Sequence, residues 1–356
     1  MKIGIPRALG YYIYYPFWHA FFNDLGIEVV LSGKTCKRIV SQGSALVVSE
    51  TCLPVKVYVG HVIDLLDKGV DVIYSPSIQS IAPKIYNCSK LRGLPDLIRN
   101  VIKRDFLLIE PTLDKSAPKQ GLYEYLYESV APLGITDKKR IKQASKAGWE
   151  CMNNYHLMTK AGMPIDVARK NAIAGKVEIV NDHDNFPISV AVLSHGYNLH
   201  DDHVSMKVFK KLEKLKVKSY TSDNLTKEEM SAGVNVLNTQ LYWANEYEMT
   251  GAAGHFLKDN NIDGIVTITA FGCGPDSLMV ERITRYAKRL KKPLLNLTID
   301  EHTGEAGFIT RLEAFTDMLL RRKRTTIVEA LNKQVYRDNS DIQRIRAEIE
   351  RMKINV

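Results

Sequence analysis

A cysteine between two glycines is the most distinctive chemical feature of the sequence. Cys273 lies in the stretch Phe-Gly-Cys-Gly-Pro-Asp-Ser at 271–277. The β-branched and apolar residues 265–269 predict a buried strand before it, and the apolar spacing after Asp276 predicts a helix. Open α/β sheets bind ligands at strand ends, and a helix N-terminus favours a thiolate. The pattern therefore predicts a metal-bound or nucleophilic thiolate at Cys273, with a buried thiol in a tight turn as the alternative.

Two further cysteines are predicted at comparable positions. Cys52 lies in the segment Ser-Glu-Thr-Cys-Leu-Pro, between a predicted strand at 45–48 and a predicted helix at 55–68. Cys88 follows a strand end and an irregular loop. Because the carboxyl ends of parallel strands lie at one edge of a sheet, we expect these thiols to face Cys273 across a cleft between two β/α units.

Structural roles are predicted for the other two cysteines. Cys36 is near a predicted strand end, but no glycine or proline shapes its surroundings. We predict a packing or surface cysteine there, with a fourth metal ligand as the alternative. Cys151 lies in a predicted helix beside Trp149 and Met152, which indicates a core position. An odd number of cysteines, spread over a long chain without an export signal, argues against a disulfide framework.

Three converging thiolates point to metal chemistry. A [4Fe-4S] cube held by three protein thiolates keeps one iron open for water or substrate. The intervals between the three cysteines, 36 and 185 residues, match no compact ferredoxin spacing, so the cluster is inferred from residue type and position. Zinc uses similar thiols, and unligated cysteines are the other alternative.

Acidic and histidine residues near predicted strand ends are candidates for proton transfer. The candidate catalytic residues are Glu50, His195, Glu301 and His302. Structural packing or helix capping is the alternative for these side chains, and Asp276 is expected to cap a helix. Cys273 with His195 or His302 would form a nucleophile and base pair. Neither a Gly-x-Gly-x-x-Gly motif after the first strand nor a phosphate loop ending in Gly-Lys-Ser/Thr occurs, so dinucleotide or ATP binding lacks its usual signal.

The alternation of short apolar strands with amphipathic helices predicts an α/β fold built on parallel sheets. Residues 120–179 instead carry apolar and aromatic side chains at helical spacing, so we predict helices there. The predicted units are two parallel-sheet β/α domains at 1–110 and 187–320, a helical connecting segment at 111–186, and C-terminal helices at 321–356.

Composition and charge narrow the function classes. The chain of 356 residues is 45% hydrophobic and lacks both an apolar run of membrane-spanning length and a signal-peptide pattern, so we expect a cytoplasmic protein outside membranes. The net charge of +9 comes from helix faces without interleaved aromatic residues. This argues against nucleic-acid binding and is compatible with a phosphate-bearing ligand such as a coenzyme A ester. The polar stretch 181–185 is predicted to be a linker rather than a cation site.

Four stretches of the sequence carry a family resemblance. They are Ile-Gly-Ile-Pro-Arg-Ala-Leu at 3–9, Glu-Thr-Cys-Leu-Pro-Val-Lys at 50–56, Phe-Gly-Cys-Gly-Pro-Asp-Ser at 271–277 and Asp-Glu-His-Thr-Gly-Glu-Ala-Gly at 300–307. With them the chain resembles the 2-hydroxyglutaryl-CoA dehydratase D-component-like proteins of anaerobes, in the group of CoA enzyme activase-related (acyl-CoA dehydratase activase-related) proteins.

The resemblance implies two Rossmann- or flavodoxin-like domains around a [4Fe-4S] cluster held by Cys52, Cys88 and Cys273. It also implies a separate ATP-dependent activator with its own cluster, an acyl-CoA substrate, and low-potential electron transfer or 2-hydroxyacyl-CoA dehydration. We expect a homodimer or heterodimer, with a double-cubane cluster shared between chains as a minor alternative. A non-catalytic cluster carrier or electron-transfer protein, and a metal-free two-domain binder of a small ligand, are the other functions kept open.

Overall fold

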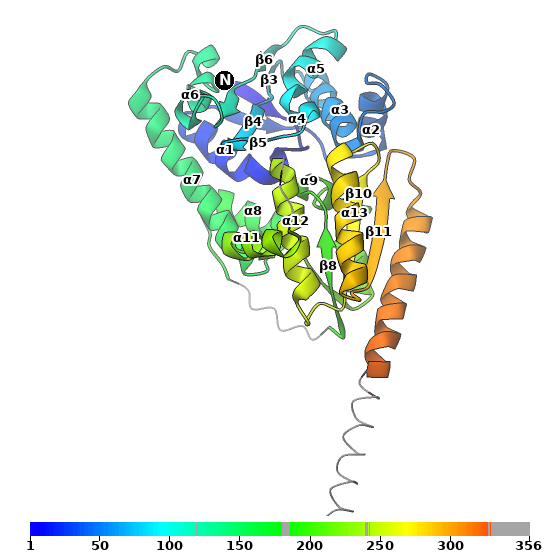
Figure 1. Cartoon of the computed structure of the whole chain (residues 1–356). Coiled ribbons are helices and arrows are strands. Elements are labelled where there is room, and N and C mark those ends of the chain that lie inside the picture. The colour runs from blue at the N-terminus through cyan, green and yellow to red at the C-terminus, as the bar shows by residue number, and fades with distance from the viewer. Residues whose placement is uncertain (119, 180–185, 239–240, 242, 327, 329–356) are drawn as a thin grey trace, which may run out of the picture.

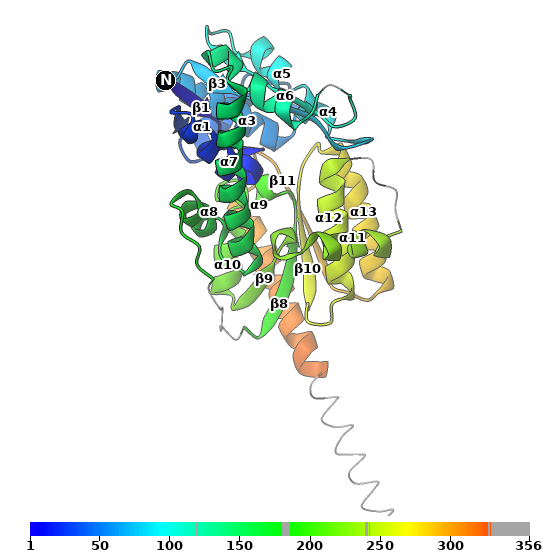
Figure 2. The ribbon, with the colours of Figure 1, turned by 90° about the vertical axis from the view of Figure 1, so that its left-hand side faces the viewer.

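Two parallel sheets, one in each half of the chain, form the framework of the molecule (Figure 1). The structure is a computed structural model that describes residues 1–118, 120–179, 186–238, 241, 243–326 and 328. The expected α/β fold, with two parallel-sheet units and further helices, is confirmed. Figure 2 shows the first sheet and its helices above the second, with helix α7 (Lys138–Lys160) running along one side of both.

The first sheet lies in the N-terminal half. Its elements are β1 Lys2–Ile5, α1 Tyr11–Asp24, β2 Glu28–Leu31, α2 Lys37–Ser44, α3 Leu53–Asp67, β3 Val72–Tyr74, α4 Ser89–Arg92, α5 Leu94–Val101 and β6 Leu107–Ile109. The strands are parallel in the order β2-β1-β3-β6. Because strand side chains alternate, Ile73 packs in the core beside α3 and α5, whereas Tyr74 packs against the aromatic residues of α1.

A helical segment follows, as residues 120–179 predict. It consists of α6 Leu122–Glu128, η1 Ala131–Leu133, α7, and α8 Ile165–Ile173. α7 packs along α1. The ring of Phe17 lies 4.9 Å from that of Trp149, and a Cβ on Gly148 would lie 2.8 Å from Phe17. A glycine in the middle of α7 therefore lets the two helices approach closely.

The second sheet has the same parallel design. Its elements are β8 Ile188–Leu193, α9 Gly196–Leu199, α10 Val208–Lys214, β9 Val217–Tyr220, η2 Ser222–Asn224, α11 Lys227–Val236, α12 Ala244–Lys258, β10 Gly264–Ala270, α13 Gly274–Arg289 and β11 Leu294–Ile299. The strand order is β11-β10-β8-β9. All seven residues of β10 are buried, as expected of a central strand covered on both faces. Residues 305–326 form a further helix, shown in orange beside β11 in Figure 1.

One predicted strand is wrong. Residues 45–48 follow α2 as a turn, and Leu46 and Val48 are 41% and 71% exposed. Four apolar residues are too few for periodicity to separate a strand from a helix end. Cys52 therefore follows a helix and a turn rather than a strand.

A small third sheet was not predicted. It has the order β5-β4-β7 and comprises β4 Ser77–Ala82, β5 Ile85–Tyr86 and β7 Thr112–Asp114. These strands are short and rich in polar residues, so they carry little periodic signal. β5 ends two residues before Cys88 and so positions it. The predicted linker at 181–185 lies outside the described residues.

The two sheets share one apolar core. Val57 and Ile73 of the first half belong to the same buried cluster as Val190, Val266 and Leu297 of the second half. Separation of the two halves would expose this apolar surface to water, so its burial holds the halves together. Among the described residues, no helix has the length and apolar character needed to span a bilayer.

Candidate functional site

Four helices begin at a cysteine, and three of these cysteines belong to the predicted site. Cys52, Cys88 and Cys273 are the N-cap residues of α3, α4 and α13, and each has an extended backbone. A proline in the first turn starts both α3 and α13. The unpaired N–H groups and the dipole of a helix N-terminus favour a negatively charged sulfur. The prediction that Cys52 and Cys273 lie at helix starts is confirmed.

The loops around these cysteines adjoin one another at the carbonyl oxygen of Glu50. A Cβ atom on Gly272 would lie 3.1 Å from this oxygen. The Lys90 ammonium donates a hydrogen bond to the same oxygen at 3.2 Å. Each of these residues is within two positions of one of the three cysteines, so the contacts bring the three loops together.

The electrostatics of the thiols also indicate proximity. Burial is the main cause that raises the pKa of Cys52 and of Cys273. A thiolate at Cys88 would raise the pKa of Cys52 further, and a thiolate at Cys52 would do the same to Cys273. Burial is the main cause that raises the pKa of the Tyr197 hydroxyl. Asp276 and the three cysteines are the next causes, and each raises it further. Tyr197 therefore lies within range of the whole thiol group.

Without a cation the three groups are neutral thiols. Burial is the main cause that raises the pKa of each, and the Asp276 carboxylate adds to it at Cys273. The backbone N–H three residues after each cysteine acts in the opposite direction, because it favours the thiolate. A metal ion that bound here would therefore displace protons from the sulfurs.

A buried histidine and carboxylate extend the site beyond Cys273. The His195 Nε2 and Asp276 Oδ1 atoms are 2.7 Å apart, and both side chains are 2% exposed. Burial disfavours the charged imidazole, but the Asp276 carboxylate outweighs it and raises the pKa of His195. The His195 Nδ1 and Asp276 Oδ2 atoms have no hydrogen-bond partner among the described residues. One ligand atom each of His195, Cys273 and Asp276 lie within 4.8 Å of one another.

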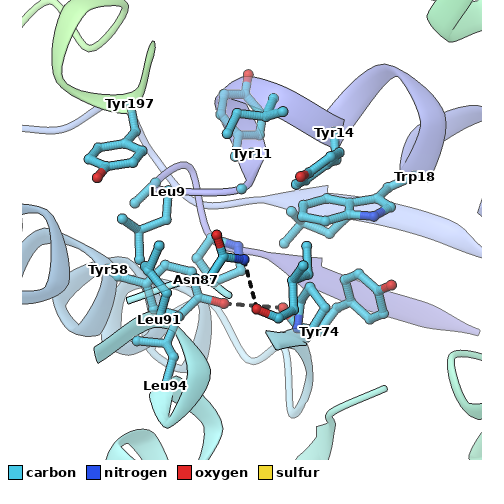
Figure 3. A pocket seen from close by; sticks show the side chains of 17 residues that line it. Leu9, Tyr11, Tyr14, Trp18, Tyr58, Tyr74, Asn87, Leu91, Leu94 and Tyr197 are labelled. Atoms are coloured by element: carbon cyan, nitrogen blue, oxygen red, sulfur yellow. Dashed lines mark hydrogen bonds between the residues drawn. The ribbon is translucent and has the colours of Figure 1, made fainter. Parts of the chain in front are cut away.

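A narrow, mainly apolar cavity adjoins the Cys88 loop, because Asn87 and Leu91 belong to its wall (Figure 3). Its volume is about 60 Å³, and it opens to solvent. Five aromatic side chains line one part of it: Tyr11, Tyr14, Trp18, Tyr58 and Tyr74. Asn87, Leu91 and Tyr197 complete the wall near the cysteines, with Asn87 held by a 2.7 Å hydrogen bond to the Ile78 carbonyl oxygen. A cavity of this kind suits an apolar ligand with few polar groups.

The other candidate catalytic residues have different environments. Glu50 is exposed. Glu301 forms an ion pair with Lys56, and this partner, acting against burial, lowers the pKa of the Glu301 carboxyl. The His302 side chain is 86% exposed. Among the described residues, His195 is the one candidate whose side chain bonds a residue next to the Cys273 turn, whereas Glu50 reaches that turn through its backbone carbonyl.

The other two cysteines, Cys36 and Cys151, are not part of this site. Cys36 is exposed at the start of α2, in agreement with a surface role. Cys151 is buried in α7, and burial raises the pKa of its thiol to about 11. The core position predicted for Cys151 is confirmed.

Sequence reasoning missed two members of the site. Asp276 was expected to cap α13, but its side chain makes no cap and bonds His195 instead. Its position three residues after Cys273 gave no sign of this, because the partner is 81 residues away. Tyr197 has only a weak signal, as one aromatic residue in the turn after β8.

Comparison with known proteins assigns the family. The family described as "CoA enzyme activase uncharacterised domain" matches residues 2–225, well over half of the chain. The chain belongs to this family. The matched range includes Cys52, Cys88 and His195, whereas Cys273 and Asp276 lie beyond it. The match agrees with the resemblance to CoA enzyme activase-related proteins.

The other comparisons support no further conclusion about this family member. No curated protein matches the chain. A crystal structure from Silicibacter pomeroyi DSS-3, of a protein described as a phosphosugar isomerase, is 11% identical, with 91% of this chain and 87% of that chain covered and a TM-score of 0.20. So low a TM-score supports no argument about fold or function.

Proposed function

We propose that this protein binds a [4Fe-4S] cluster through Cys52, Cys88 and Cys273, and works in low-potential reduction or in 2-hydroxyacyl-CoA dehydration. The observation that carries the proposal is that Cys52, Cys88 and Cys273, one buried and two half-buried, begin three helices whose loops meet at the Glu50 carbonyl oxygen. Membership of a CoA enzyme activase family is compatible with this role.

The donor set suits such a cluster. Cysteine thiolates are its usual ligands, and N–H groups near the sulfurs stabilise the negative charge. A Cβ on Gly274 would meet no atom within 4 Å, so there is unfilled space next to Cys273. A cluster bound by three cysteines supplies one-electron redox chemistry at low potential and one iron position open to a ligand.

The chain's own residues would bind and orient the substrate. The aromatic cavity would offer an apolar acyl group a wall with few polar atoms, with Tyr197 at its boundary with the cysteines. His195 and Asp276 share a proton across 2.7 Å and hold it near Cys273. This pair could therefore hold or release a proton beside the reacting group.

A separate ATP-dependent activator would supply the electron. The basis for a docking surface is the exposed apolar pair Phe271 and Leu278, which are 66% and 52% exposed near the start of α13. An activator bound there would lie close to Cys273. The proposal includes assembly of the protein as a homodimer or as a heterodimer.

Iron and acid-labile sulfide content after oxygen-free purification tests the proposal. We expect about four of each per chain, with visible absorbance, and loss of most of both in Cys52→Ser, Cys88→Ser and Cys273→Ser. Cys151→Ser and Cys36→Ser are the matched controls and should keep the wild-type content. Equal iron in all five variants, or none in the wild type, would contradict the cluster.

A mononuclear metal site is the second candidate, favoured by one observation. His195, Cys273 and Asp276 each offer a ligand atom within 4.8 Å of the others, which is a mixed N/S/O set of the kind that holds zinc. This site predicts one metal per chain without sulfide, lost in His195→Gln and unaffected by Cys88→Ser. The same assay therefore separates it from the cluster.

Further measurements separate catalytic from other roles. If the cluster is stable but its spectrum does not respond to acyl-CoA or small reducible ligands, the protein is a cluster carrier or electron-transfer protein. If the triple serine variant folds and still binds a small ligand, the protein is a metal-free binder.

A further inference from the structure

A second cavity lies between the two halves, with Tyr11 lining both it and the aromatic cavity. Its volume is about 880 Å³, part of it open to solvent. Arg7 and α1 line it from the first half, Arg169 lines it from α8, and residues 200–207 and 300–305 line it from the second half. It contains none of the five cysteines, so it is distinct from the site described above.

Most acidic groups in this cavity already have partners. Tyr12 and Thr35 donate to Asp201 Oδ2, and the backbone amides of His203 and Val204 donate to Oδ1. The other paired acids are Asp202 with Lys210, Asp300 with Thr303, Glu301 with Lys56 and Glu305 with Lys211. Asp166 is the exception, and it is exposed.

The basic groups in the cavity are not balanced in this way. Five cationic side chains lining it have no carboxylate within ion-pair distance among the described residues: Arg7, Lys34, Arg169, Lys170 and Lys207. Three lining carboxylates, Asp166, Asp201 and Asp300, have no cationic partner among the described residues either, so five cations face three anions and the wall keeps an excess of positive charge that repels itself. A bound anion would relieve this repulsion.

Arg169 is the most informative of the five. It is 9% exposed, and its guanidinium stacks 4.8 Å from the Tyr11 ring centre and 5.6 Å from that of Tyr12. Its Nη1 donates to the Tyr11 hydroxyl at 3.0 Å, but its Nε is buried without a partner. A buried donor left unpaired is costly, so retaining one in a cavity wall indicates a ligand.

Arg7 repeats this arrangement on the same tyrosine. Its guanidinium carbon lies 5.9 Å from the Tyr11 ring centre, and its Nε is also buried without a partner. Tyr11 thus positions two guanidinium groups whose free N–H donors serve one cavity. Guanidinium forks match the oxygen geometry of phosphate and carry charge at every physiological pH.

We propose that this cavity binds a phosphate-bearing ligand, with Arg7 and Arg169 contacting a phosphate group and Lys34, Lys170 and Lys207 adding charge at the rim. Phosphate is favoured over a single carboxylate because two guanidinium forks on one tyrosine offer more N–H donors than the two oxygens of one carboxylate accept. The proposal goes beyond the cluster function and does not depend on it.

Calorimetric titration of the full chain with inorganic pyrophosphate at low ionic strength tests the proposal. We expect binding of one pyrophosphate per chain, weakened about tenfold or more in Arg169→Gln and in Arg7→Gln. Arg285→Gln removes a guanidinium that is 77% exposed and paired with Glu281, and should leave the affinity unchanged. Absence of binding, or equal affinity in all variants, would overturn the proposal.

Further measurements complete this test. Circular dichroism and thermal unfolding establish that each variant is folded. Arg169→Lys, which keeps the charge but loses the fork, replaces Arg169→Gln if that variant does not fold.

Succinate should bind at least tenfold more weakly than pyrophosphate, since equal binding would contradict selection for phosphate. If coenzyme A binds more tightly than pyrophosphate, the phosphate groups that the cavity binds belong to a nucleotide ligand. If the two bind equally, the ligand is the free anion. The Cys52→Ser variant should bind pyrophosphate as the wild type does, so failure of the cluster proposal leaves this one testable.

Discussion

His61 shows how a single buried side chain couples this fold to pH. Its Nε2 lies 2.9 Å from the Thr35 hydroxyl, its Nδ1 has no partner among the described residues, and the side chain is fully buried in α3. Burial lowers the pKa of His61 from 6.5 to about 3. The folded protein therefore holds the neutral imidazole, whereas the unfolded chain protonates it below pH 6.5.

From this we predict acid sensitivity that depends on His61. Its folded-state pKa is depressed, so the stability gained by keeping it neutral is present above pH 6.5 and is lost as the pH falls toward 3. Between pH 7.5 and pH 5, the wild type should lose about 2 kcal/mol of unfolding free energy through this group. Urea unfolding of His61→Gln should show a smaller loss, and an equal loss in both proteins would contradict the assignment.

Gly272 allows a second residue-scale prediction. Its φ is +75°, and a Cβ would lie 3.1 Å from the Glu50 carbonyl oxygen. Gly272→Ala should lower the unfolding free energy by about 1 to 2 kcal/mol and move the Cys273 loop. Gly26→Ala is the matched control, because Gly26 has a φ of +77° but no atom within 4 Å of a Cβ. Chemical denaturation should show the larger loss at Gly272, and equal losses would mean that the contact with Glu50 does not matter.

At the scale of elements, glycines set how closely the helices that carry the site can pack. A Cβ on Gly60 of α3 would overlap the carbonyl oxygen of Ile39 in α2, and one on Gly43 of α2 would overlap that of Lys56. The two helices therefore touch through their backbones. Because α3 begins at Cys52, this contact determines where that thiol lies.

Gly60→Ala should force α2 away from α3. We expect a loss of about 1 to 3 kcal/mol in unfolding free energy, because backbone atoms cannot yield as a flexible side chain would. Gly307→Ala, in the exposed helix 305–326, has open space and should be neutral or stabilising by about 0.5 to 1 kcal/mol. Thermal unfolding compares the two, and a loss at Gly307 equal to that at Gly60 would contradict the packing argument.

At the scale of the whole molecule, an ion pair joins the two halves. The Lys56 side chain is 3% exposed and binds Glu301 of the second half, and its ammonium also donates to the Ser49 carbonyl oxygen at 2.9 Å. A single cation thus connects the loop before Cys52 to the turn after β11. The Lys56 end of the pair is buried, whereas Glu301 is 18% exposed and lines the cavity between the halves.

Lys56→Met should destabilise the protein by about 3 to 5 kcal/mol, because the carboxylate of Glu301 then lacks its buried partner. Hydrogen exchange should rise in residues 49–52 and 300–303. Lys210→Gln breaks an exposed pair with Asp202, whose side chains are 62% and 57% exposed, and should change stability little. A double-mutant cycle with Glu301→Gln measures the coupling, and additive effects would mean that the pair does not join the halves.

Local periodicity and turn chemistry were enough to predict the fold class. The buried strand predicted at 265–269 lies within β10, and the glycine and proline around Cys273 correctly placed it at a helix start. These features depend on residues adjacent in sequence, so they can be read without knowing any partner. The same approach failed at 45–48 and for the third sheet, where the segments are too short to show a period.

Contacts between distant residues were decided only by the tertiary structure. The bond between His195 and Asp276 joins positions 81 residues apart, and Arg7 and Arg169 meet on Tyr11 from helical and strand units far apart in the chain. Such contacts depend on how two sheets stack and how closely helices pack, which no local pattern encodes. The sequence by itself determined which residue types stand at helix starts and strand ends, whereas packing between the halves decided which of them share a cavity.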